Sequence, residues 1–254
     1  MGKFLIGLAI LLAVFAGDVS ASPGISLKGN GLSFGNLRSE GKVIDGLSLT
    51  LGSLDLESMP LDEINGVSLT LFPSASKLRG ISVSLTFAKH NKVTGIAMGG
   101  VMAGGAEGEM TGIIIGGIAA TGREVTGIAI GGLLSEQEAL NGFSFAGLYA
   151  TARKVKGIQI AIISEQEHLN GLSLGVFNLA QEVYGIQVGV CNGCFGVIYD
   201  PFPNLEICAG EVNGVQIGLF NCTEQLHGVQ IGLINYAGNN NPFLRVIPLI
   251  NVHF

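Results

Sequence analysis

The residues of this 254-residue chain that are best suited to chemistry are its four cysteines. Cys191, Cys194 and Cys208 fall in or beside an irregular stretch at 192–212, and Cys222 follows it. An even number of cysteines in an exported chain favours disulfides, which would join Cys194 to Cys208 and leave Cys191 and Cys222 on neighbouring units. The Cys-x-x-Cys spacing is also typical of zinc ligands, but the second such pair of a four-thiolate site is missing. Disulfides, zinc and buried thiols all remain open, and we favour disulfides without a metal.

The remaining polar residues form no catalytic arrangement. No histidine is spaced from a Cys, Glu or second His as a metal ligand or a base would be. Three of the four (His90, His168, His227 and His253) fall in predicted turns or corners, where we expect solvated side chains. Serines recur at one position of a repeat, and no Gly-x-Ser-x-Gly nucleophile elbow is present. The Gly-Gly pairs at 99, 104, 116 and 131 lack the Lys-Ser/Thr that follows a phosphate-binding loop. We therefore predict a protein that is not an enzyme and binds no cofactor.

The irregular stretch at 192–212 is the candidate interaction loop. It interrupts the most regular part of the chain and centres on Tyr199-Asp-Pro-Phe-Pro203. Loops carried by a rigid scaffold are where binding residues tend to collect. Tyr199, Asp200 and Phe202 are therefore the candidate residues for contact with a partner, and a stapled loop that binds no partner is the alternative.

These residues are carried by a tandem repeat. Asn213-Gly-Val-Gln-Ile-Gly-Leu-Phe-Asn221 returns as His227-Gly-Val-Gln-Ile-Gly-Leu-Ile-Asn235, and weaker copies run through the chain. With the glycine as position zero, the copies start at Gly31, Gly46, Gly66, Gly80, Gly95, Gly112, Gly127, Gly142, Gly157, Gly171, Gly185, Gly214 and Gly228. Most gaps are 14 or 15 residues, whereas the gap of 29 after Gly185 fits one unit plus an insertion. A fixed period of this kind indicates stacked units that share a core.

Alternation within each unit predicts strands. Apolar residues occupy positions +1 and +3, and Ser, Ala or Gln lies between them. The alternation predicts an inward-facing +3 row (Ile160, Leu174, Val188, Ile217 and Ile231) and an outward-facing Gln216. The phase breaks between −2 and +1, so we expect a bend at the glycine. Asn recurs at +7 in late units, where left-handed turns and stacked amides that satisfy turn carbonyls are both expected.

The predicted fold is all-β, a β-solenoid-like array of 14–15-residue units. Similar Ser-Glu-Gln-Glu stretches at 135 and 164 leave open a true period of two units, giving two-sided coils or an up-and-down sheet. The alternative is an up-and-down outer-membrane β-barrel, which the apolar residues at even positions from Leu244 to Phe254 would suit. Against it, the apolar stripe of most units is about 15 Å tall after tilting, short of the ~25 Å membrane band, and aromatic girdles are missing.

Composition and the N-terminal segment indicate export. Residues 1–21 resemble a signal peptide, with Lys3, an apolar run and small residues before Ser22; an uncleaved anchor is the alternative. Residues 22–243 form the array with its insertion at 192–212, and 244–254 form a C-terminal strand. Gly makes up 40 residues and the net charge is −6, which argues against nucleic-acid binding.

The Gly-Val-Gln-Ile-Gly-Leu-x-Asn units, closed by Pro-Leu-Ile-Asn-Val-His-Phe254, resemble a bacterial family of surface repeat-containing proteins, found in leptospires and related Gram-negative bacteria. The resemblance covers 142–254 closely and 24–141 more loosely. It implies export and a location at the cell surface or outer membrane, with the periplasm as an alternative, and it brings no functional residues. We expect a structural or adhesive envelope protein with an envelope or host-surface partner, association with the outer membrane, and no nucleic acid.

Overall fold

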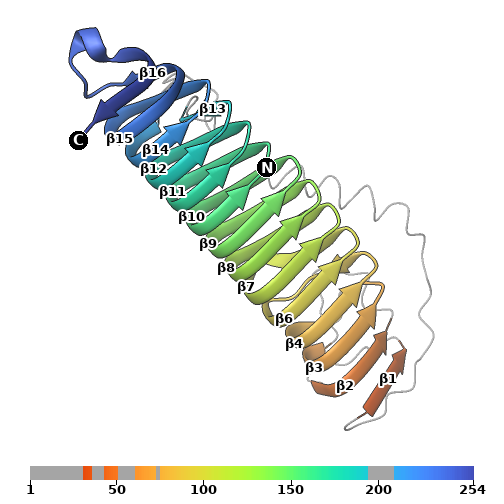
Figure 1. Cartoon of the computed structure of the whole chain (residues 1–254). Coiled ribbons are helices and arrows are strands. Elements are labelled where there is room, and N and C mark those ends of the chain that lie inside the picture. Colours follow the sequence, from red (N-terminus) through yellow and green to blue (C-terminus); the bar gives the residue numbers. More distant parts are fainter. Residues whose placement is uncertain (1–30, 36–42, 51–60, 73–74, 194–208) are drawn as a thin grey trace, which may run out of the picture.

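The structure is a computed structural model that describes residues 31–35, 43–50, 61–72, 75–193 and 209–254. In the described ranges nearly every residue lies in a β-strand, and the coils are stacked in one column (Figure 1). The N-terminal half contains β1 (Gly31–Gly35), β2 (Val43–Thr50), β3 (Leu61–Thr70), β4 (Ala75–Ser84), β5 (Phe87–Ala88), β6 (Lys92–Gly99), β7 (Met102–Gly116) and β8 (Ala119–Gly131). The C-terminal half contains β9 (Leu134–Ala146), β10 (Tyr149–Ile160), β11 (Ile163–Leu174), β12 (Phe177–Val188), β13 (Cys191–Asn192), β14 (Ala209–Ile217), β15 (Phe220–Ala237), the 3₁₀ turn η1 (Pro242–Leu244) and β16 (Val246–His253).

Each unit of the repeat is one complete turn of a β-solenoid. Neighbouring strands pair in parallel and in register, so that the repeat glycines Gly157, Gly171 and Gly185 stand side by side. This confirms the predicted solenoid. The suggested two-unit period is wrong, because glycines one unit apart already pair. The alternative of an up-and-down barrel is wrong as well, because its neighbouring strands would be antiparallel.

The repeat glycine forms a corner in every described coil from β2 to β15. Gly214, for example, has φ +148°, and a Cβ there would lie 2.0 Å from the carbonyl oxygen of Gly185 in the coil below. Side chains other than hydrogen are excluded on both counts, because the backbone conformation is unfavourable and the space is filled by backbone. The predicted bend at the glycine is therefore confirmed.

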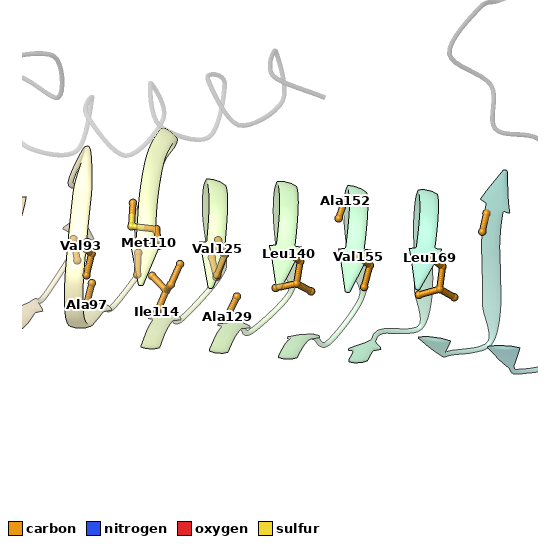
Figure 2. Packing of buried hydrophobic residues seen from close by; sticks show 14 of the residues in the cluster. Val93, Ala97, Met110, Ile114, Val125, Ala129, Leu140, Ala152, Val155 and Leu169 are labelled. Atoms are coloured by element: carbon orange, nitrogen blue, oxygen red, sulfur yellow. The ribbon is translucent and has the colours of Figure 1, made fainter. Parts of the chain in front are cut away.

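The interior of the column is narrow and is filled by four positions of each coil. In β11 these are Ser164, Gln166, Leu169 and Ser173, all buried. The −2 position supplies the large aliphatic side chains, and Figure 2 shows this row as Val93, Met110, Val125, Leu140, Val155 and Leu169, with Ala97, Ile114 and Ala129 beside it. Burying each such Val or Leu contributes about 1.5–3 kcal/mol, and one coil alone cannot bury it.

The gap of 29 residues after Gly185 contains one coil and additional chain. Gly185 pairs directly with Gly214, and β13 and β14 both lie between β12 and β15, so they are two parts of one coil. Residues 194–208 lie outside the described residues. Without these 15 residues the spacing would be 29 − 15 = 14, which is one ordinary unit.

The C-terminal end of the column is covered by β16, which pairs with β15 in the antiparallel direction (Figure 1). The register shifts between Gly232 and Asn235, and Leu249 adopts φ 69° opposite Gly232. The antiparallel β16 ends the stack of parallel coils. A further coil that paired in parallel with β16 would have to run opposite to all the other coils. The edge of β15 is thereby paired.

Candidate interaction surface

The apolar +1 and +3 side chains point outward, which is the reverse of the sequence-based prediction. Of the predicted core row, Ile217 is 40% exposed and Ile231 is 41% exposed, whereas Ile160, Leu174 and Val188 are half-buried. Gln216, predicted to face solvent, is fully buried. The strand alternation itself is correct, and only the assignment of its two faces is wrong.

Polar side chains can fill the interior because the coils stack identical residues one strand spacing apart. Gln216 donates through Nε2 to Oε1 of Gln187 (2.9 Å) and accepts from Nε2 of Gln230 (2.8 Å). Gln230 in turn accepts from Nδ2 of Asn251 in β16 (3.2 Å). Gln216 and Gln230 thus use both ends of their amides, whereas Gln187 uses only its oxygen and its Nε2 is buried without a partner.

A second ladder of amides supports the turn that follows position +3. Asn178, Asn192, Asn221 and Asn235 are linked in that order by Nδ2–Oδ1 hydrogen bonds of 2.8 Å each. Their amides also donate to backbone carbonyls, such as Val188 O (2.9 Å) and Ile231 O (3.0 Å). The prediction that stacked Asn amides satisfy turn carbonyls is confirmed. The prediction of left-handed Asn is wrong, because among the described residues Leu249 alone of the non-glycines has positive φ.

The outward apolar side chains form continuous rows because the coils are in register. Ile158, Leu172, Ile186, Val215 and Val229 are successive neighbours at +1. The +3 row runs beside it, and the turn at +5 and +6 adds a third. We call these rows the apolar face. Its most exposed members are Val67, Leu69, Ile81, Leu85, Met98, Ile128, Leu133, Phe145, Leu148, Ile158, Ile162, Val176, Phe177, Ile186, Val190, Ile217, Leu219, Phe220, Ile231, Leu233 and Ile234.

The terminal strand continues the apolar face although it runs the other way. Val252 pairs with Val229 of the +1 row, and Ile250 pairs with Ile231 of the +3 row. Ile250 is 57% exposed, while Asn251, which lies between Ile250 and Val252 in the sequence, is buried in the Gln ladder. The cap therefore reproduces both the inner and the outer surface of an ordinary coil.

The apolar face carries no charge. In every copy of the repeat, the seven residues from the glycine to position +6 contain no Asp, Glu, Lys or Arg. Charged side chains lie on the other half of the coil, and there they pair between stacked coils. Glu109 contacts Lys92 (3.1 Å) and Arg123 (3.3 Å) from the coils on either side. Charges of opposite sign thus stand on neighbouring single coils.

This uncharged segment is the signal that sequence analysis missed. A position that faces water along an array of this length would carry Lys or Glu in some copies. Position +2 carries only Ser, Ala, Gln and Ile in the copies from Gly46 to Gly228. Small or ladder-forming residues at +2, without any charge, fit a buried row. The flanking apolar rows could then have been assigned to the outside.

The histidines do not all occupy the solvated turns that were expected. His90 is buried, and its Nδ1 lies 2.7 Å from the carbonyl oxygen of Ala75, which can only accept; Nδ1 therefore carries the proton. The other ring nitrogen, Nε2, then accepts from the Ser82 hydroxyl (3.2 Å). Burial lowers the pKa of His90 to about 4, against the opposing effect of the Ala75 hydrogen bond. His90 is thus a neutral core residue, contrary to expectation.

The other three histidines lie at the surface of the column. His168 is hydrogen-bonded to Glu182 of the next coil (2.8 Å between Nδ1 and Oε2). His227 and His253 stand edge to face across the β15–β16 pair, with ring centroids 6.1 Å apart. Among the described residues, no group of three or more His, Cys, Asp or Glu is placed to hold a metal ion.

The cysteines and the candidate loop are only partly described. Cys191 lies beside Phe220 in the strand pairing, and Cys222 is buried and takes part in a disulfide. Cys194 and Cys208 lie outside the described residues, so their predicted pairing stays a prediction. Tyr199, Asp200 and Phe202 also lie outside them, as does the N-terminal segment 1–21.

Comparison with protein-family models, curated proteins and solved structures finds no match for this chain. Across the described part of the chain, no helix is long and apolar enough to span a membrane.

Proposed function

We propose that this chain is a non-enzymatic, exported repeat protein of the bacterial cell envelope, with a structural or adhesive role exerted through its apolar face. The observation that carries the proposal is the division of every coil into an uncharged apolar half and a charged half. An exposed apolar surface of this extent marks an interaction site. The N-terminal segment and the surface-protein resemblance support the envelope location.

The interior supports a structural role as well. Buried amides such as those of Gln216, Gln230 and Asn221 are engaged in ladders that hold the coils in register. Such ladders make the column a rigid support that presents the same side chains at each step. A rigid and repetitive surface is suited to multiple weak contacts in parallel with one partner.

The proposal is tested by locating the full chain in a Gram-negative host. Two added lysines on the apolar face, Ile158→Lys with Ile186→Lys, are compared with two on the charged half, Asn170→Lys with Gln181→Lys. We expect wild type and the charged-half variant in the envelope fraction, and the apolar-face variant released from it. Cytoplasmic retention of the wild type, or equal envelope retention of all three proteins, would contradict the proposal.

A further inference from the structure

The apolar face is larger than the apolar patches that monomeric proteins usually expose. From β3 to β16 it extends for roughly 50 Å, taking ~4.8 Å per strand. The segment from +1 to +6 spans roughly 15–20 Å at ~3.3 Å per residue. The face therefore covers about 800–1,000 Å², whereas the largest patch on a typical monomer is about 300–600 Å².

Charge distinguishes between the two kinds of surface that could cover this face. Proteins that lie on anionic membranes usually combine an apolar face with flanking Lys or Arg and interfacial Trp. Here the chain has no Trp and a net charge of −6, and the apolar segment contains no basic residue in any copy. Of the cations that flank the segment, Arg79 and Lys92 each pair with a glutamate of a neighbouring coil. An anionic membrane surface would thus gain little from this face.

We propose that the apolar face is covered by the apolar face of a second copy, so that two solenoids pack sheet against sheet in a two-fold symmetric dimer. The proposal rests on the proposed function and names the occupant of the same surface. About 800–1,000 Å² per copy matches the ~800 Å² per partner of a stable interface. Homodimer interfaces are also more apolar than other protein surfaces, as this face is.

The in-register rows suit this packing. Rows of Ile, Val and Leu one strand apart offer ridges and grooves along the column, and two such sheets can interdigitate at ~10 Å separation. The two charged halves would then face outward on opposite sides of the dimer. Because β16 carries Ile250 and Val252 in line with the rows, the interface extends to the C-terminal cap.

The test is sedimentation equilibrium of the purified mature chain, with its disulfide intact, in detergent-free buffer over a concentration series. We expect twice the monomer mass for wild type and for Asn170→Lys/Gln181→Lys. Ile158→Lys/Ile186→Lys should remain folded by circular dichroism, because Ile158 and Ile186 are 39% and 42% exposed. It should associate at least about 100-fold more weakly, because each copy would bury unpaired ammonium groups in the interface.

Vesicle flotation, with phosphatidylethanolamine–phosphatidylglycerol vesicles, completes the experiment. A wild type that is monomeric throughout the series, or that floats with vesicles as a monomer, overturns the dimer. Dimers of unchanged affinity in the apolar-face variant overturn it too, because the copies would then meet elsewhere. If that variant does not fold, the wild-type mass still decides. A monomer found in the envelope leaves the proposed function standing, whereas a dimer found in the cytoplasm removes the function and keeps the interface.

Discussion

Two buried glutamines of the +2 row should respond in opposite ways to the same substitution. Gln216 is held in the ladder by Gln187 and Gln230, at 2.9 and 2.8 Å. Gln159 stands in the same row between Ser144 and Ser173, whose short side chains do not reach it. Both atoms of its amide are buried without a hydrogen-bond partner. Gln216→Leu therefore removes an amide whose hydrogen bonds are made, whereas Gln159→Leu removes an amide that has none.

The structure allows the size of each effect to be estimated. Gln216→Leu leaves the Gln187 oxygen and one Gln230 N–H without partners, at about 1–3 kcal/mol each, and Leu burial offsets part of this. Gln230 keeps its second bond, to the Tyr236 carbonyl (2.9 Å). We expect a net loss of about 1–3 kcal/mol in the free energy of unfolding. Gln159→Leu removes a desolvated amide, and we expect a gain of about 1–2 kcal/mol.

Urea unfolding followed by circular dichroism measures both changes, with Gln181→Leu as the control at an exposed position. The control should stay within about 0.5 kcal/mol of wild type. The double variant Gln187→Leu/Gln216→Leu should lose less free energy of unfolding than the sum of the two single variants. The reason is that the Gln187 oxygen, which Gln216→Leu leaves without a donor, is absent from the double variant. Equal effects at Gln159 and Gln216, or a stabilised Gln216→Leu, would refute the assignment of the +2 row to a ladder-bearing interior.

Three further predictions concern the corner, the buried histidine and the insertion. Gly214→Ala should lower the free energy of unfolding by about 3 kcal/mol or more, and Asn213→Ala by less than about 1 kcal/mol. Only position 214 needs positive φ, and a Cβ added there would lie 2.0 Å from a carbonyl oxygen. Equal urea midpoints for the two variants would show that the corner tolerates a side chain. Because the pKa of His90 is lowered to about 4, its contribution to stability is complete above the unfolded pKa of about 6.5 and is lost as the pH falls toward 4. Wild type should thus lose about 2–3 kcal/mol between pH 7 and 4.5 that His90→Gln does not lose, and parallel pH profiles would exclude this cause. Deleting residues 194–208 should restore a 14-residue coil and keep the strand spectrum, while any cell or envelope binding by the loop disappears; a deletion protein without strand signal would show that the two coil parts cannot join directly.

The sequence by itself determined the repeat and the secondary structure. The 14–15-residue spacing, the period of two and the recurrent glycine together predict stacked coils with a corner at Gly214, and each of these follows from local conformational preference. The stacking of Asn178, Asn192, Asn221 and Asn235 was also predictable, because residues one unit apart in a solenoid become neighbours. These features need no knowledge of what lies inside the column.

Only the tertiary structure decided which face of the strand is buried. Local alternation is the same for either choice, and the usual preference for apolar interiors selected Ile217 over Gln216. The decision depends on the narrow cross-section of the coil and on the in-register stacking that lets buried amides bond to their own copies. The burial of His90 arises in the same way, because its partners Ala75 and Ser82 both lie on β4 of the preceding coil, which only the stacking brings against His90.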